Sequence, residues 1–410
     1  MSLENAPIVP LKDVVKRVKV GFVGSCNDDY CSSDEGVPMI RTTNLTKEGI
    51  KLDNLKYINN KFHIDHKKSQ LNFGDILIAR HGHNGLASLW EYKFDAQCLN
   101  VVVVEPDESL ANRYYLTYLI NSPIIQKQIK SLTGGSVQSV VNTKDIADLL
   151  IPVPSLDKQK EIADFISLFN KKIRVNKNIN KNLDELLMSI FKSWFVYFDD
   201  VDEFKSDENL GEIPKSWSVE MLEDYVDFVT GVEPGSKNYH EKPEKNDIPF
   251  IRVGDLGSRD NLVFIDKSVS KNKILKYEDI VLSMDATIGI VKMGLEGAYS
   301  TGMRKLVIKN DLINKPFLYC LVKSERIQRI IETFATGTTI LHAGKSIKHM
   351  NFVLSDEMTM KNFGKIGENI LTRILSNMKE IEKLTQLRDT LLPKLMSGEI
   401  DVSKINCDLK

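Results

Sequence analysis

The chain has 410 residues, of which 42% are hydrophobic and 27% charged, and its formal net charge is −1. This length allows about two to four domains with cores of their own, and the composition is ordinary for a soluble protein. The sequence contains neither an apolar run of about 18 residues nor a basic and then apolar N-terminal segment, so we expect no membrane span and no export signal. The five scattered cysteines predict free thiols and a cytoplasmic location.

The first predicted domain covers residues 1–155 and mixes helices with short strands. Its expected elements, in chain order, are a short helix, three strands and a longer helix, at residues 11–18, 39–41, 75–79, 99–105 and 112–132. Four consecutive valines at 101–104 are typical of a buried strand. Because strands and helices do not alternate regularly, we predict an α+β domain rather than a doubly wound sheet.

A first long helix is predicted at residues 156–198. Its apolar residues recur in alternating steps of four and three, at Ile162, Ile166, Phe169, Ile173, Leu183, Leu187, Ile190 and Trp194. This spacing is that of a coiled-coil seam, and a helix of about 36 residues would be roughly 54 Å long. The gap in the seam falls on Asn176 and Asn180. Asn176 either fixes the register of a helix pair at a cost in stability or lies at a frayed, solvated edge.

An acidic linker at residues 199–213 precedes a second predicted domain at 214–357, a second long helix at 358–400 and a tail at 401–410. The seam of the second helix consists of Ile370, Ile374, Met378, Ile381, Leu384, Leu387, Leu391 and Leu395. Pro393 lies inside this pattern, so we expect the helix to kink or end there.

The second half of the chain repeats the first. VPMIR at 37–41 corresponds to IPFIR at 248–252, and GLA at 85–87 corresponds to GIV at 289–291, in the same order and at an offset of about 200 residues. A duplicated unit predicts a pseudo-twofold protein, which suits a nearly twofold partner such as duplex DNA. Because an apolar seam is not stable alone in water, we expect the two long helices to cover each other, antiparallel, and to hold the two domains apart.

The order of domain, long helix, domain and long helix resembles the DNA-specificity subunit of Type I restriction–modification systems. Short phrases add to the resemblance, which covers nearly the whole chain: IPVP at 151–154, IFKSWF at 190–195, GEIP at 211–214 and LLPKLMSGEI at 391–400. It implies a non-catalytic subunit whose two α+β target-recognition domains each read one half of a split, asymmetric site in double-stranded DNA. It also implies modification subunits docked on the helices and restriction subunits in the complete nuclease. S-adenosylmethionine, ATP and Mg²⁺ would then be bound by those partners, and no cofactor by this chain.

Side chains suited to base edges occur in predicted loops of both domains. Arginine can pair with guanine, Asn or Gln with adenine, and an apolar group can contact a thymine methyl. The candidates in the first domain are Arg41, Thr43, Asn44, Arg80, His81, His83, Asn84, Ser136 and Gln138. Those in the second domain are Arg252, Asp255, Asp285, Thr287, Arg304, Thr338 and Thr339. The frame repeats while the loop side chains differ, as an asymmetric target requires and as drift of surface loops would also produce.

Charge limits this interpretation. A net charge of −1 gives it no support, because DNA affinity usually depends on Lys and Arg at phosphates. Arg41 and Arg252 occupy matching positions, and a shared residue is a better candidate for a phosphate contact or a structural role than for discrimination. The cluster of Trp194, Phe195 and Phe198 is interpreted either as core or as a docking patch for a partner subunit.

Catalytic and metal sites are not predicted. The chain lacks the Pro-Pro pair and the G-x-G-x-x-G motif expected of a DNA methyltransferase, and GKS at 344–346 lacks the P-loop spacing. His63, His66, Cys26 and Cys31 fit no common zinc module. Two alternatives remain: a coiled-coil scaffold that binds proteins but no DNA, and an enzyme fused to its own specificity domains, against which the missing motifs argue.

Overall fold

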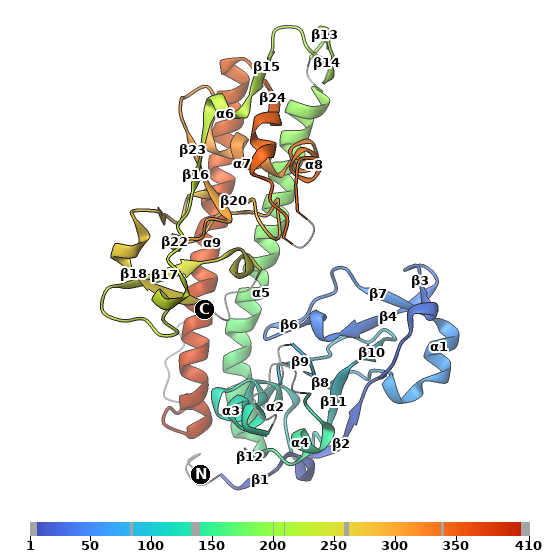
Figure 1. Cartoon of the computed structure of the whole chain (residues 1–410). Coiled ribbons are helices and arrows are strands. Elements are labelled where there is room, and N and C mark those ends of the chain that lie inside the picture. Colours follow the sequence, from blue (N-terminus) through green and yellow to red (C-terminus); the bar gives the residue numbers. More distant parts are fainter. Residues whose placement is uncertain are drawn as a thin grey trace. The chain divides into compact units, whose positions relative to one another are not determined.

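A computed structural model describes residues 6–82, 85–132, 140–199, 201–208, 210–257, 262–337 and 340–402 (Figure 1). The chain divides into two compact units. Unit 1 comprises Met1–Val175 and Ile381–Lys410, and unit 2 comprises Asn176–Glu380. Each unit therefore contains one globular domain and one part of each long helix.

Two four-stranded sheets form the domain of unit 1. The first has the order β2-β11-β8-β9, with bounds Val15–Val20, Val101–Pro106, Ile76–Ala79 and Ala87–Leu89, and its strand pairs are antiparallel. The second has the order β10-β4-β7-β3, with bounds Gln97–Leu99, Gly36–Arg41, Lys56–Asn59 and Tyr30–Cys31. In the second sheet β10 runs parallel to β4. The valines of β11 are fully buried, as the four-valine run predicted.

Smaller elements complete unit 1. Two-stranded pairs join β1 (Ile8–Pro10) to β12 (Leu150–Pro152) and β5 (Leu45–Thr46) to β6 (Gly49–Ile50). The helices are α1 (Asn60–Asp65), α2 (Arg113–Ile120), α3 (Pro123–Leu132) and α4 (Thr143–Ala147). The core cluster lies between the first sheet, α2, α3 and residues of both long helices.

Two predicted helices of unit 1 differ from the observed elements. Residues 112–132 form two helices rather than one, because α2 ends at Ile120 and Pro123 starts α3; a proline is tolerated in a first turn but not in a helix interior. The predicted helix at 11–18 is a 3₁₀ turn, Leu11–Val14, that leads directly into β2. The β-branched residues of β2 favour the strand.

Unit 2 repeats this topology in its first sheet and in three strands of its second. Its first sheet has the order β16-β23-β20-β21, with bounds Val226–Thr230, Met303–Ile308, Ile280–Ser283 and Val291–Lys292. Its second has the order β18-β17-β22-β19, with bounds Val263–Asp266, Asp247–Ile251, Gly297–Tyr299 and Ile274–Leu275, and β17 is parallel to β22 as β4 is to β10. The pair β15 (Ser218–Met221) and β24 (Asn351–Leu354), with α6 (Leu222–Tyr225), α7 (Lys315–Lys323) and α8 (Glu325–Thr333), completes the domain. The predicted α+β class and internal repeat are confirmed.

The segment predicted as an acidic linker contains regular structure. Strands β13 (Phe204–Asp207) and β14 (Gly211–Pro214) pair antiparallel. Ile213 of β14 and the following Trp217 are buried, and Trp217 belongs to the apolar core of unit 2.

Two long helices run through both units, α5 (Leu156–Lys192), which continues as a π-helical turn at Ser193–Tyr197, and α9 (Glu357–Ser397). They are antiparallel within each unit. In unit 1, Lys158 bonds to Asp401 and Asn170 to Arg388. In unit 2, Asn176 bonds to Glu380 while Phe191, farther along α5, meets Phe363.

The contacts along α5 and α9 depart in part from the predicted seams. Leu387, assigned to the second seam, is 51% exposed, whereas its neighbour Arg388 is only 4% exposed. Asn176 is 1% exposed and donates to Glu380 Oε2 at 2.8 Å, which excludes the frayed-edge interpretation. Helix α9 continues through Pro393 to Ser397, so it does not end at the proline.

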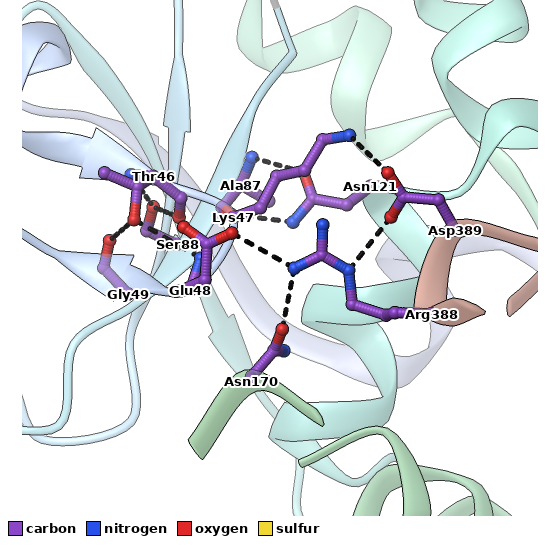
Figure 2. A network of polar contacts seen from close by, with 10 residues as sticks. All are labelled: Thr46, Lys47, Glu48, Gly49, Ala87, Ser88, Asn121, Asn170, Arg388 and Asp389. Carbon is purple, nitrogen blue, oxygen red and sulfur yellow. Dashed lines mark hydrogen bonds and ion pairs between the residues drawn. The ribbon is translucent and has the colours of Figure 1, made fainter. Parts of the chain in front are cut away.

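Arg388 is held by a polar network inside unit 1 (Figure 2). Its Nη1 donates to Asn170 Oδ1 on α5 at 2.8 Å and to Glu48 Oε1, in the β5–β6 hairpin, at 3.2 Å. Its Nε donates to Asp389 at 2.9 Å. The hairpin is fixed in turn to β9, because Ser88 Oγ accepts from Thr46 N and donates to Thr46 O. One guanidinium thus links the domain to both long helices.

Candidate nucleic-acid interface

The strand pairing of unit 1 brings two of the predicted loops together. Strand β4 ends at Arg41, which lies beside Leu99, the last residue of the parallel strand β10. Two residues later Val101 pairs with Ala79, the last residue of β8. Because the turn at Asn100 joins both pairs, the loop that begins at Arg41 and the loop after Ala79 emerge at the junction of the two sheets.

Val141 also lies at this junction. Arg80 Nε donates to the carbonyl oxygen of Val141 at 3.2 Å, and Val141 N donates to the carbonyl oxygen of Arg80 at 3.2 Å. Val141 is fully buried, and the third predicted loop, residues 133–138, lies outside the described residues. We call residues 41–44, 80–82, 99–100 and 140–141 loop face 1.

Unit 2 brings its loops together by equivalent pairings. Ile251 at the end of β17 pairs with Tyr299 at the end of β22, and Ser283 at the end of β20 pairs with Met303. Met284 N donates to Gly302 O at 2.8 Å. The loops after β17 and β20 therefore meet at the turn between β22 and β23, as in unit 1.

The third loop of unit 2 closes onto the second by hydrogen bonds. Ala286 N donates to Leu341 O at 2.9 Å, and His342 Nδ1 lies 2.8 Å from Asp285 Oδ1. Ala286 adopts a φ of 60°, which is strained for a residue with a side chain. We call residues 252–255, 284–287, 300–304 and 340–343 loop face 2.

The structure places the predicted site residues unequally. Thr43, His81 and Thr287 are exposed, and Arg41, Arg80, Arg252, Asp285 and Arg304 are partly buried. Six candidates lie outside the described residues: His83, Asn84, Ser136, Gln138, Thr338 and Thr339.

Two candidates are structural instead, Asn44 at 4% and Asp255 at 6% exposure. Asn44 Oδ1 accepts from Arg41 N at 2.9 Å, and Asp255 Oδ2 accepts from Arg252 N at 2.8 Å. Each side chain stabilises the 3₁₀ turn after a strand and cannot reach a base edge. The prediction that these two residues contact DNA is corrected on this ground; sequence alone does not distinguish a polar cap from a polar reader.

Arg304 stabilises the turn that precedes it. Its Nη1 donates to the carbonyl oxygens of Thr301 at 2.5 Å and Met303 at 3.0 Å. Burial lowers the pKa of the Arg304 guanidinium, while nearby Asp285 opposes that shift. The residue thereby holds the β22–β23 turn that organises loop face 2.

The two loop faces differ in charge. The described residues of loop face 1 include Arg41 and Arg80 and no carboxylate. Loop face 2 contains the basic residues Arg252 and Arg304 and the acidic residues Asp255 and Asp285, so the formal charges of these four side chains sum to zero. A near-neutral total charge therefore conceals one basic loop face, which is the sign that phosphates attract.

The predicted docking patch is mostly core. Phe195 and Phe198 are 6% and 9% exposed and belong to the apolar cluster of unit 2. Phe195 lies edge-on to Phe317 at 4.9 Å between ring centroids. Trp194 is partly buried against the same cluster. Of the two interpretations of this cluster, the core interpretation is therefore the one observed for Phe195 and Phe198, because aromatic groups on a helix end are well suited to packing.

Within the described ranges, no three metal-ligating side chains lie together. His66 stacks on Phe62 at 3.9 Å between ring centroids, and its Nδ1 lies 3.0 Å from Phe62 O, so it belongs to local packing. A search of the same ranges for a helix long and apolar enough to cross a membrane finds none.

The chain belongs to the family of the Type I restriction modification DNA specificity domain, whose model matches residues 8–185 and 214–352. The two matched segments begin near β1 and near β15, at corresponding points of the repeat. The predicted family is thus confirmed.

Named relatives agree with this assignment. The Type I restriction enzyme MjaIX specificity subunit of Methanocaldococcus jannaschii is 27% identical over 71% of this chain and 70% of its own length. A putative MjaX specificity subunit of the same organism is 26% identical over 97% of this chain and 94% of its own. Both are named specificity subunits rather than enzymes acting alone, in agreement with a non-catalytic chain.

A solved structure shows the same fold. The S subunit of a Type I restriction–modification system from M. genitalium matches with a TM-score of 0.51 at 17% identity, over 95% of this chain and 96% of that chain. The match extends over both domains and both long helices.

Proposed function

We propose that the chain reads a two-part, asymmetric sequence in double-stranded DNA, one part with each loop face. The observation that supports this most is the convergence of two loops at equivalent strand ends in both units, on a repeated frame. A frame that repeats while its loop residues change supplies the same approach to DNA with different hydrogen-bonding groups, which is what two unlike half-sites need.

The proposal extends to assembly. As a family member without catalytic motifs, the chain would deliver modification subunits, and through them restriction subunits, to the bound sequence. S-adenosylmethionine, ATP and Mg²⁺ would be bound by those partners. The cytoplasm, where cellular DNA of a bacterium or archaeon lies, is the compartment in which this activity would operate.

Selection from a random duplex library tests the proposal. The full chain in complex with its modification subunits should enrich a motif with two specified parts and a fixed unspecified spacer. Thr43→Ala and Thr287→Ala are matched variants of exposed threonines on loop faces 1 and 2. We expect each to alter the base preference of one part only, and a motif with one continuous part, or none, would contradict the proposal.

A second candidate is a scaffold that binds proteins but no DNA, which the net charge of −1 and the balanced charges of loop face 2 favour. Salt titration separates the two functions. A DNA reader loses affinity steeply as salt rises, with a slope of about −0.9 for each phosphate contacted. A scaffold would show no duplex binding that depends on base sequence at any salt concentration.

A further inference from the structure

Arg41 and Arg252 occupy the same place in the repeated fold but have different partners. Arg41 is the last residue of β4 and Arg252 directly follows β17, so each begins a loop of its loop face. Each donates its backbone N–H to the side chain three residues later. In unit 2 that side chain is Asp255, a carboxylate. In unit 1 it is Asn44, a neutral amide.

This difference between Asp255 and Asn44 decides whether the positive charge of the arginine is neutralised within its own loop. Arg252 Nε and Nη2 donate to the two carboxylate oxygens of Asp255 at 2.9 and 3.0 Å. The pair is bidentate, and the hydrogen bonds to Asp255 raise the pKa of Arg252. Such a pair is charge-neutral as a whole and its geometry is fixed by the 3₁₀ turn. The Arg252 guanidinium is therefore held by Asp255 within its own loop.

Arg41 has no equivalent carboxylate. Among the described residues none forms an ion pair with it, and its Nε is buried without a hydrogen-bond acceptor. The side-chain amide of Asn44 is occupied by other hydrogen bonds, since its Oδ1 accepts from Arg41 N and its Nδ2 donates to the carbonyl oxygen of Lys51 at 3.3 Å. A buried N–H without an acceptor is costly, and the positive charge that the Arg41 guanidinium carries is not neutralised by a carboxylate among the described residues, so an anion is favoured beside it.

The surroundings of Arg41 favour an anion from outside the chain. It belongs to loop face 1, whose described residues carry a second arginine, Arg80, and no carboxylate. Arg80 uses its Nε internally, on the carbonyl oxygen of Val141. A phosphodiester presents paired oxygens that match the planar fork of a guanidinium.

We propose that Arg41 binds a backbone phosphate of the DNA, whereas Arg252 at the matching position in unit 2 does not. The inference rests on the proposed function and deepens it, because it makes the two domains unequal in how they hold the duplex. In unit 1 the positive charge of Arg41 at the end of β4 is available to bind a phosphate. In unit 2 the charge of Arg252 is neutralised by Asp255.

The test compares Arg41→Gln with its matched control Arg252→Gln in the full chain complexed with its modification subunits. Affinity for the selected duplex is measured over a range of salt concentrations. We expect Arg41→Gln to weaken binding about tenfold for selected and unselected sequences alike and to reduce the salt slope by about one. Arg252→Gln should change affinity less than about twofold and leave the slope unaltered.

A reciprocal variant tests the cause of the difference. Asp255→Asn keeps an oxygen that can accept from Arg252 N, as Asn44 does in unit 1, but removes the charge that neutralises Arg252. We expect it to tighten binding several-fold and to steepen the salt slope. Circular dichroism and thermal unfolding of each complex show whether a variant has folded.

The outcomes separate the inference from the function on which it rests. If the unmodified chain selects a two-part motif but Arg41→Gln binds it equally well with the same salt slope, the inference is wrong and the proposed function stands. The phosphate assignment would also be wrong if Arg41→Gln lost preference at a single base pair while the salt slope of its DNA affinity stayed the same. If the unmodified complex selects no two-part motif, the proposed function itself fails.

Discussion

Units 1 and 2 bury different kinds of side chain between α5 and α9. In unit 1, Asn170 on α5 meets Arg388 on α9, which forms a polar step in the helix pair. In unit 2, Leu187 on α5 and Leu371 on α9 are buried in the apolar core, and the polar contact of Asn176 with Glu380 involves no arginine. The helix pair thus buries an arginine in unit 1, whereas Leu187 and Leu371 are packed in hydrocarbon in unit 2.

This difference teaches that a repeated fold tolerates a buried charge where a domain loop can neutralise it. Glu48 of the β5–β6 hairpin supplies the compensating carboxylate in unit 1. A buried ion pair adds little net stability over well-packed apolar groups, but the loss of one partner leaves an uncompensated charge. We therefore expect the polar step of unit 1 to be more sensitive to single substitution than to joint replacement.

Replacement of Arg388 should have the largest effect. Arg388→Ala removes the buried guanidinium that Glu48 and Asn170 contact and should lower the free energy of unfolding of unit 1 by about 4 kcal/mol. The double variant Asn170→Leu and Arg388→Leu replaces the polar step with apolar side chains and, combined with Glu48→Gln, should recover most of the loss. Hydrogen exchange in residues 381–397 reports the change; equal destabilisation by the triple variant would contradict it.

Truncation of Phe195 should come next. Phe195→Ala removes a buried ring from the core of unit 2 and should cost about 3 kcal/mol. Its neighbour Val196 is 47% exposed, so Val196→Ala is the matched control, with an effect within about 0.5 kcal/mol. Chemical denaturation measures both. If Phe195→Ala left stability intact but abolished binding of a modification subunit, the docking interpretation would be restored.

The shared helix caps should differ modestly between the units. Asn112 Oδ1 accepts from Tyr114 N and Tyr115 N at the start of α2, and Asn112→Ala should cost about 1 kcal/mol. Asn314 caps α7 in the same way but also donates to Met360 O on α9 at 2.7 Å. Asn314→Ala should therefore cost about 2 kcal/mol. Thermal unfolding that ranks Asn112→Ala as the more damaging would contradict this comparison.

The smallest effect concerns pH. In unit 2, His240 Nδ1 pairs with Asp247, where the repeat places Gly36 in unit 1. The hydrogen bond raises the pKa of His240 above 6.5 and lowers the pKa of Asp247 below 3.8. The stabilisation by His240 is complete below pH 6.5 and is lost as pH rises through its folded pKa; that by Asp247 is present above pH 3.8 and is lost as pH falls through its folded pKa.

An NMR titration of His240 checks this pair. Asp247→Asn should return the pKa of His240 toward 6.5, since the hydrogen bond to a carboxylate is the main cause of its shift. Because the His240 side chain is 33% exposed, salt will weaken the effect. A titration curve of His240 that is identical in the two proteins would refute the assignment.

Much of the frame was predictable because periodicity and repetition are properties of the sequence itself. The valine run gave the central strand β11, the seam spacing gave both long helices, and the offset between VPMIR and IPFIR gave the duplicated domain. The loop faces follow from the ends of these strands, which is why Arg41 and Arg252 were found at matching positions.

The errors share a physical cause, the ambiguity of a single side chain. Seam spacing selects Leu387, but a neighbouring Arg388 is buried because Glu48, distant in sequence, neutralises it. Asn44 and Asp255 have the donors and acceptors of a base reader, yet the 3₁₀ turns use them as caps. Phe195 fits an exposed patch as well as a core. Only the long-range contacts distinguish these roles.

The discontinuous make-up of unit 1 has a consequence for biosynthesis. Ile162 and Ile166 share their core cluster with Leu392, Leu395 and Met396, which leave the ribosome long after them. A nascent chain that has completed its first domain must keep that apolar surface uncovered, or temporarily shielded by a chaperone, until residues 392–396 have been made. Premature termination shortly before residue 381 would therefore expose part of the core of unit 1 as well as truncate α9.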